Sequence, residues 1–137
     1  MTLDHIGIAV ADLPAMEQLL GRLLGRASYK RETIYDQSVL TSFFKAGGAE
    51  AKIELVTPVE GGGPIAKYLE KRGPGMHHLA FETDDIHREM RRLADDGFEL
   101  LQELPSRGAD NKLICFLHPR STGGVLVEIC QSITDEQ

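Results

Sequence analysis

Two segments of the chain repeat each other, and this repeat constrains the fold more than any other feature of the sequence. Residues 3–12, LDHIGIAVAD, align with residues 76–85, MHHLAFETDD, so that His5 falls on His78. Residues 52–56, KIELV, align with residues 126–130, LVEIC, so that Glu54 falls on Glu128 at almost the same spacing. Because each half carries a histidine near its start and a glutamate near its end, the sequence indicates a duplicated unit.

Hydrophobic periodicity predicts the same order of elements in both halves, β-α-β-β-β. In the first half we expect strands over residues 3–10, 28–33, 39–46 and 51–57. In the second half we expect strands over residues 76–83, 98–103, 112–118 and 124–130, with 106–111 as a loop. One helix should begin after Asp12 and end near Gly25, and its counterpart should run from Asp85 to Gly97, since aspartate is a good N-cap and glycine a good stop.

The repeat also sets the expected domain organisation. Residues 1–58 form the first unit, residues 59–75 form a linker with a short helix over 65–72, and residues 76–137 form the second unit. Together they predict one α+β domain, in which the two βαβββ units form a curved mixed sheet around a metal-binding cleft.

Composition excludes several classes of protein. The 42% apolar and 26% charged residues are ordinary for a globular chain, and no apolar run approaches the length of a membrane span. A net charge of −6 argues against a broad nucleic-acid-binding face. Without a secretory signal, Cys115 and Cys130 in apolar runs favour reduced core thiols and a cytoplasmic location.

Strand alternation predicts which side chains share a face. In the first half, His5 shares a face of its strand with Gly7, and Glu54 points to the face opposite its apolar neighbours. In the second half, His78 and Glu128 follow the same pattern. If the helices cover the apolar faces of the strands, two imidazoles and two carboxylates point into one cleft. Such a donor set suits a six-coordinate divalent ion with two open positions, and Co²⁺, Mn²⁺, Ni²⁺, Fe²⁺ and Zn²⁺ remain open. For each residue alone, a hydrogen-bonded histidine or an edge glutamate is the commoner interpretation.

The chain resembles a known family nearly from end to end. The matching motifs are DHIGIAV (4–10), IEL (53–55), PIAKYLEK (64–71), GMHHLAF (75–81) and, most specifically, FLHPRSTGGVLVE (116–128). These resemble the vicinal oxygen chelate superfamily, which includes glyoxalase I, bleomycin-resistance proteins and dioxygenases, and within it the methylmalonyl-CoA epimerases. Arg120 stands where the family usually has lysine, and the position of Glu54 is Glu or Gln in the family.

The resemblance implies that His5, Glu54, His78 and Glu128 bind a divalent metal, and that the reaction inverts the carbon between a thioester and a carboxylate. Glu128 would be one of the two proton-transferring groups. The second proton-transferring group is not identified, because the strand around residues 41–42 carries no carboxylate. Glu32 and Asp36 are the nearest acidic residues, and neither can be placed at the site from the sequence.

Binding of an acyl-CoA substrate requires positive charge on an acidic protein. We predict Arg107, Lys112, Arg120 and Ser121 as substrate-binding residues, although ordinary solvated loop charge explains any one of the three basic residues at least equally well. We also expect a homodimer, with no nucleic-acid or membrane partner.

Two other functions remain open. A glyoxalase-type isomerase would share the metal site but would act on a glutathione hemithioacetal. A non-enzymatic protein that sequesters a small molecule would have the same fold, but such members tend to lack the metal ligands.

Overall fold

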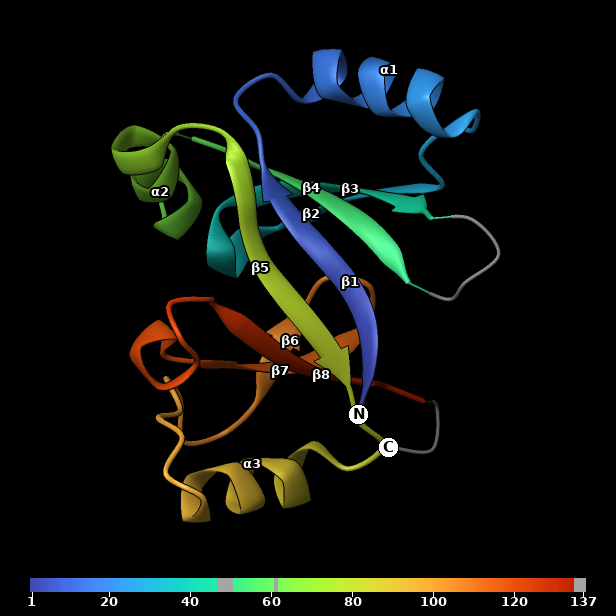
Figure 1. Cartoon of the computed structure of the whole chain (residues 1–137). Coiled ribbons are helices and arrows are strands. Elements are labelled where there is room, and N and C mark those ends of the chain that lie inside the picture. Colours follow the sequence, from blue (N-terminus) through green and yellow to red (C-terminus); the bar gives the residue numbers. More distant parts are fainter. Residues whose placement is uncertain (47–50, 61, 135–137) are drawn as a thin grey trace. The chain divides into compact units, whose positions relative to one another are not determined.

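The structure is a computed structural model that describes residues 1–46, 51–60 and 62–134. Its contacts divide the chain into two compact units, which we describe separately (Figure 1). One unit is His5–His77, and the other combines Met1–Asp4 with His78–Gln137. The first four residues therefore group with the second half of the chain.

The His5–His77 unit contains the first βαβββ repeat and the connecting helix. Its elements are β1 (Thr2–Ala9), α1 (Leu13–Leu24), β2 (Lys30–Ile34), the short 3₁₀ helix η1 (Tyr35–Gln37), β3 (Val39–Lys45), β4 (Lys52–Pro58) and α2 (Pro64–Arg72). The strands follow the order β2-β3-β4-β1, in which only the β1–β4 pair is parallel. Helix α1 covers one face of this sheet through an apolar cluster that includes Leu13, Leu20, Phe44 and Leu55.

The unit that contains His78 repeats this plan. Its elements are β5 (Gly75–Glu82), α3 (Ile86–Asp95), β6 (Ser106–Gly108), β7 (Lys112–Leu117), the 3₁₀ helix η2 (Pro119–Ser121) and β8 (Val127–Ser132). The order is β5-β8-β7-β6, again with one parallel pair, β5–β8. Ile86, Met90 and Leu93 of α3 pack against Cys115 and Ile129. The α+β class and the two βαβββ units are confirmed.

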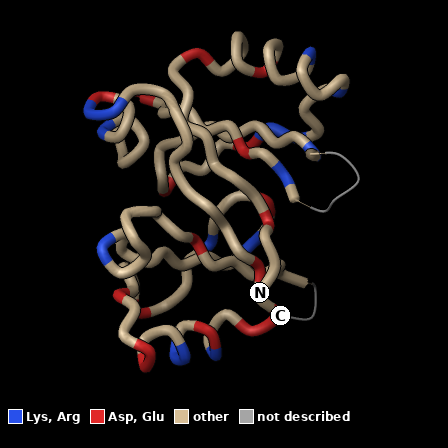
Figure 2. The backbone as a smooth tube through the Cα atoms, viewed as in Figure 1, with Lys and Arg blue, Asp and Glu red and all other residues tan. Residues whose placement is uncertain are grey.

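The helices begin where the sequence predicts. Asp12 Oδ1 accepts the N–H of Ala15 at 3.1 Å, and Asp85 Oδ1 accepts the N–H of Arg88 at the same distance. Helix α1 ends at Gly25, whose φ of +70° is a backbone conformation that glycine adopts without strain. Basic and acidic residues are interspersed along α3 (Figure 2), whereas Ile86, Met90 and Leu93 are buried, as expected for an amphipathic helix.

The predicted strand over residues 98–103 is wrong. Leu100 forms only an isolated bridge with Leu117, and the edge strand is β6, within the segment 106–111 that we expected to be a loop. Two backbone hydrogen bonds flank this bridge, from the Leu101 N–H to the Phe116 carbonyl at 2.9 Å and from the His118 N–H to the Glu99 carbonyl at 2.7 Å. The ladder does not continue beyond them, since Gln102 Oε1 accepts the N–H of Phe116 at 3.2 Å. A Cβ atom on Gly108 would lie 2.8 Å from Ile114, which explains why an edge strand here has glycine.

None of the helices among the described residues is both long enough and apolar enough to cross a membrane.

Candidate functional site

The first histidine–glutamate pair lies on the parallel strands β1 and β4. Gly7 is the register partner of Glu54, so that His5, two residues earlier on β1, projects from the same face of the sheet. His5 Nε2 lies 3.5 Å from Glu54 Oε1, and the two side chains are only 6% and 7% exposed. The predicted alternation of this pair agrees with the geometry.

The second pair occupies the equivalent position on β5 and β8. Ala80 is the register partner of Glu128, and His78 Nε2 lies 3.8 Å from Glu128 Oε1, with both side chains buried. The neighbouring His77 faces the other way, where its ring lies edge-on to Tyr68 at 4.8 Å. His78 therefore shares a face with Glu128 and His77 does not, and the role of His78 as a metal ligand stays a prediction.

A third repeated residue escaped the sequence comparison. Phe43, the register partner of Glu54, lies edge-on to His5, with ring centroids 6.4 Å apart. Phe116, the partner of Glu128, lies edge-on to His78 at 6.1 Å. The two phenylalanines have the same spacing in the chain as the two histidines, which is the signal that could have identified them. They restrict the orientation of both imidazole rings.

The chemistry of each pair is that of half a metal centre. Each pair offers an imidazole nitrogen beside a carboxylate oxygen, in a buried position where carboxylates are rare unless they are paired or bind a cation. Cysteine does not contribute a thiolate, since burial, with a smaller contribution from Glu128, raises the pKa of Cys115 to about 11. Burial also raises the pKa of Cys130. Both cysteines are free and buried, as expected for core thiols.

Lys112 lies in the interior of its unit, away from the loops where we predicted it. Its side chain is 5% exposed, and its Nζ donates to Asp4 Oδ1 at 3.0 Å, to Glu82 Oε1 at 3.1 Å and to Ser132 Oγ at 3.2 Å. Burial lowers the pKa of Lys112, but the two carboxylates outweigh it and hold that pKa above its ordinary value. With its three donors engaged, Lys112 joins the N-terminal residues to β5, β7 and β8, and this geometry gives it a structural role in place of CoA binding.

The other predicted substrate-binding residues occupy two different elements of the same unit. Arg107 is exposed on β6, whereas Arg120 and Ser121 lie in η2. Arg120 forms an ion pair with Glu99, and its hydrogen bonds lower the pKa of that carboxyl. Ser121 Oγ donates to the His118 carbonyl at 2.9 Å and accepts the Glu99 N–H at 3.1 Å. A contact between these residues and CoA stays a prediction.

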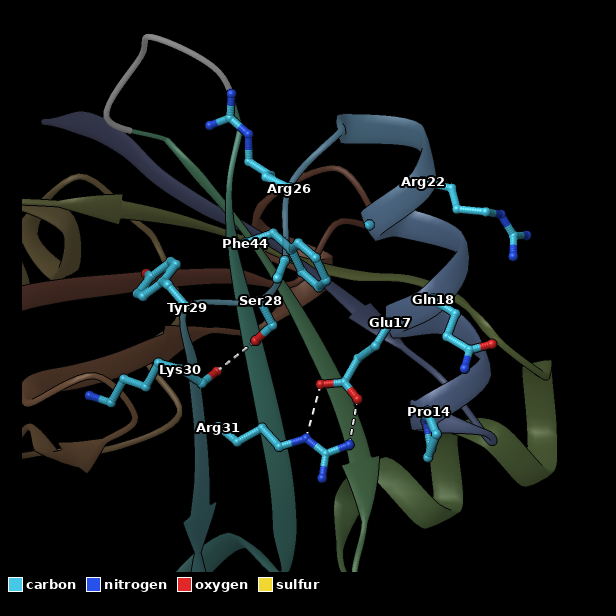
Figure 3. Close-up of a pocket in the computed structure, with 12 residues that line it drawn as sticks. Pro14, Glu17, Gln18, Arg22, Arg26, Ser28, Tyr29, Lys30, Arg31 and Phe44 are labelled. Carbon is cyan, nitrogen blue, oxygen red and sulfur yellow. Dashed lines mark hydrogen bonds and ion pairs between the residues drawn. The ribbon is translucent and has the colours of Figure 1, made fainter.

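A prominent pocket lies on the other face of the first sheet. It has a volume of about 970 Å³ and is lined by α1 and the segment around β2. Figure 3 shows Glu17 bound to Arg31 in this pocket, while Arg22 and Arg26 point away from each other. Ser42 donates to Glu17 at 2.6 Å, so that this network joins α1 to β2 and β3. Because the cations do not converge, we do not assign a ligand to this pocket.

Comparisons with known proteins agree with this geometry. The model of the Glyoxalase/Bleomycin resistance protein/Dioxygenase superfamily matches residues 4–116. The ethylmalonyl-CoA/methylmalonyl-CoA epimerase of Cereibacter sphaeroides is 37% identical over 131 residues, which cover 94% of this chain and 96% of the relative.

Two solved structures extend the likeness. The methylmalonyl-CoA epimerase of Mycobacterium tuberculosis superposes with a TM-score of 0.93 at 37% identity, covering 98% of this chain and 90% of that one. A variant of the Streptomyces coelicolor methylmalonyl-CoA epimerase in complex with 2-nitronate-propionyl-CoA gives a TM-score of 0.90 at 31% identity, covering 98% and 99%. The chain therefore belongs to the glyoxalase/bleomycin resistance/dioxygenase superfamily and, within it, to the family of methylmalonyl-CoA epimerases.

Proposed function

We propose that this protein catalyses the epimerisation of methylmalonyl-CoA in a metal-dependent reaction. The observation that carries the proposal is the repetition of a buried His–Glu pair, in the same strand register, in both halves of a chain of the epimerase family. A sequestering protein would have no need for two such pairs of ionisable residues in its interior.

The donor set fits a divalent cation. His5, Glu54 and His78 are buried and each offers a ligand atom of a suitable kind, and Glu128 completes the repeat. We propose that all four residues bind one ion together. Such an ion would supply positive charge to the carboxylate and thioester oxygens of the substrate as the enolate develops. The sequence and the donor types leave its identity open among Co²⁺, Mn²⁺, Ni²⁺, Fe²⁺ and Zn²⁺.

Residues of the chain itself handle the proton and position the substrate. Glu128 exchanges a proton with the α-carbon, because it is the carboxylate that the family resemblance assigns to this step. Gly7 and Ala80 share the faces of the two pairs and leave volume for the acyl group. Phe43 and Phe116 pack edge-on against the imidazoles and restrict their orientation.

Three further expectations accompany the proposal. We expect Arg107, Arg120 and Ser121 to contribute to CoA binding, and the titration of CoA against single alanine variants would test each of them. A homodimer and a cytoplasmic location stay predictions.

A comparison of two substrates tests the function. The protein with bound divalent metal should invert one pure epimer of methylmalonyl-CoA, followed by chiral separation of the products, and should not isomerise a glutathione hemithioacetal. EDTA should abolish the inversion, and added Co²⁺ or Mn²⁺ should restore it. Turnover of the hemithioacetal alone would move the assignment to a glyoxalase-type isomerase, and turnover of neither would favour a binding protein.

A further inference from the structure

Two lysines stand side by side on the face of the first sheet that carries His5 and Glu54. His5 is the register partner of Lys52 in the β1–β4 pair, and Lys52 is the register partner of Lys45 in the β3–β4 pair. Directly opposed partners project to the same side of a sheet, so these three residues form one row across three strands. We propose that Lys45 and Lys52, together with Tyr29, bind the nucleotide portion of an acyl-CoA substrate. All of these residues belong to one compact unit, and the inference rests on the proposed function.

The lysine pair itself points to an anionic ligand. Like charges on directly opposed strand positions destabilise a sheet, and a bound anion offsets that cost. Lys45 is exposed and Lys52 is half-buried, in a chain whose net charge is −6. The row therefore concentrates positive charge on an acidic protein. Phosphate groups suit it, since lysine binds them through charge-assisted hydrogen bonds.

The carboxylates on this face lie in other register rows. Glu54 lies in the next row and Glu32 in the one after it. Lys30 shares the face, but its Nζ lies 3.4 Å from Glu32 Oε1, so that this carboxylate engages its charge. The row of Lys45 and Lys52 is therefore where a phosphate would bind most favourably.

Aromatic rings connect this row to the histidine. The Phe43 ring lies edge-on to His5 with centroids 6.4 Å apart, and the Tyr29 ring lies 6.1 Å from Phe43. Lys45 Nζ lies 5.4 Å from the centroid of the Tyr29 ring. Tyr29 is 41% exposed, and Figure 3 shows its ring pointing away from α1. A partly exposed aromatic ring beside ammonium groups suits a nucleotide, because the base can stack on the ring while the phosphates bind the cations.

The chemical structure of an acyl-CoA matches this arrangement. Its reacting end is a thioester, and its other end is an adenosine that carries a diphosphate and a 3′-phosphate. The row begins at His5, a proposed metal ligand, and reaches β3 at two strand spacings, or about 10 Å. A ligand with its thioester at His5 and its chain running across the strands would carry its phosphates past Lys52 to Lys45.

Binding of 3′-phosphoadenosine 5′-diphosphate, which has the nucleotide but no thioester, tests the subsite itself. Isothermal titration calorimetry should give a Kd about 10-fold higher for Lys45→Met and for Lys52→Met than for the unaltered protein, since a hydrogen bond to a charged group contributes about that factor. Tyr29→Leu should also weaken binding, whereas Tyr29→Phe, which keeps the ring, should not. Lys30→Met is the matched control: it removes the same charge from the same face, at a residue engaged by Glu32, and should bind as the unaltered protein does.

Turnover of a truncated substrate separates nucleotide binding from damage to the reacting centre. Methylmalonyl-pantetheine carries the same thioester without the nucleotide. Lys45→Met and Lys52→Met should each reduce kcat/KM for methylmalonyl-CoA by about 10-fold and leave kcat/KM for the pantetheine substrate unchanged. Added salt should narrow the difference between each variant and the unaltered protein, because salt screens the attraction between exposed charges.

Three results would overturn the subsite. The first is an unchanged Kd for the nucleotide in both lysine variants. The second is an equal loss of turnover for both thioesters, which would indicate that the substitutions disturb His5 or the fold. The third is a loss in Lys30→Met as large as that in Lys45→Met, which would indicate general attraction by the charged face. If the unaltered protein turns over neither thioester, the proposed function fails, while the nucleotide titration still decides the subsite.

Discussion

Replacement of Glu128 by glutamine should reduce the epimerisation of methylmalonyl-CoA by on the order of 100-fold or more, because general acid–base groups contribute about that much to a rate. The amide keeps an oxygen that can bind a cation weakly, but it cannot take or return a proton. The measurement is kcat for inversion of one pure epimer, with the metal content determined on the same protein.

The matched control is Glu54→Gln, since Glu54 holds the equivalent position in the other half of the repeat. Its loss should be milder, because we assign it metal binding without proton transfer. If both variants lost the same activity at equal metal content, Glu128 would have no role beyond that of its counterpart.

The substitution Lys112→Met should lower the free energy of unfolding by about 3–5 kcal/mol, since removal of one partner leaves buried charge without compensation. Asp4 is 4% exposed and lies 3.0 Å from the ammonium, and Glu82 accepts a second hydrogen bond. Urea denaturation followed by circular dichroism measures the change.

A double variant, Lys112→Met with Asp4→Asn, controls for the origin of this loss. The double variant should regain part of the lost free energy of unfolding. The single variant leaves the buried Asp4 carboxylate without its cation, whereas the double variant has a neutral amide at that position. A loss below about 1 kcal/mol in the single variant, as is typical of exposed ion pairs, would contradict the importance of this network.

Much of the fold follows from short-range signals in the sequence. Asp12 and Asp85 are N-caps whose side chains accept hydrogen bonds from the first turn, and Gly25 ends α1, so local chemistry alone predicts both helices. The repeat predicts that both halves contain the same sequence of elements, because a duplicated unit keeps one fold plan, whereas the spatial order of the strands comes from the structure.

The errors arose where a tertiary contact decided the outcome. The segment 98–103 has the pattern of a strand, but its backbone pairing with β7 is limited to one bridge, because the Gln102 side chain accepts the N–H of Phe116. The short strand β6 depends on how Gly108 fits against Ile114, which no periodicity reveals. Long-range contacts of this kind override local preference.

The candidate site shows the same division. Alternation along each strand was enough to orient His5, Glu54, His78 and Glu128 towards common faces. The role of Lys112 was not predictable, because its partner Asp4 is 108 positions away in the chain. The face of the sheet to which Glu32 belongs follows only from the register of β2 on β3, which a single sequence does not specify.

Deuterium incorporation tests the central claim most directly. One pure epimer of methylmalonyl-CoA is incubated in D₂O with the metal-replete protein, and the product is analysed by mass spectrometry. Breaking of the α C–H bond should yield deuterium at that carbon in the inverted product, since the returning proton comes from a residue that exchanges with solvent. An inverted product without deuterium, or no reaction of the metal-replete protein, would contradict epimerisation by proton exchange at this site.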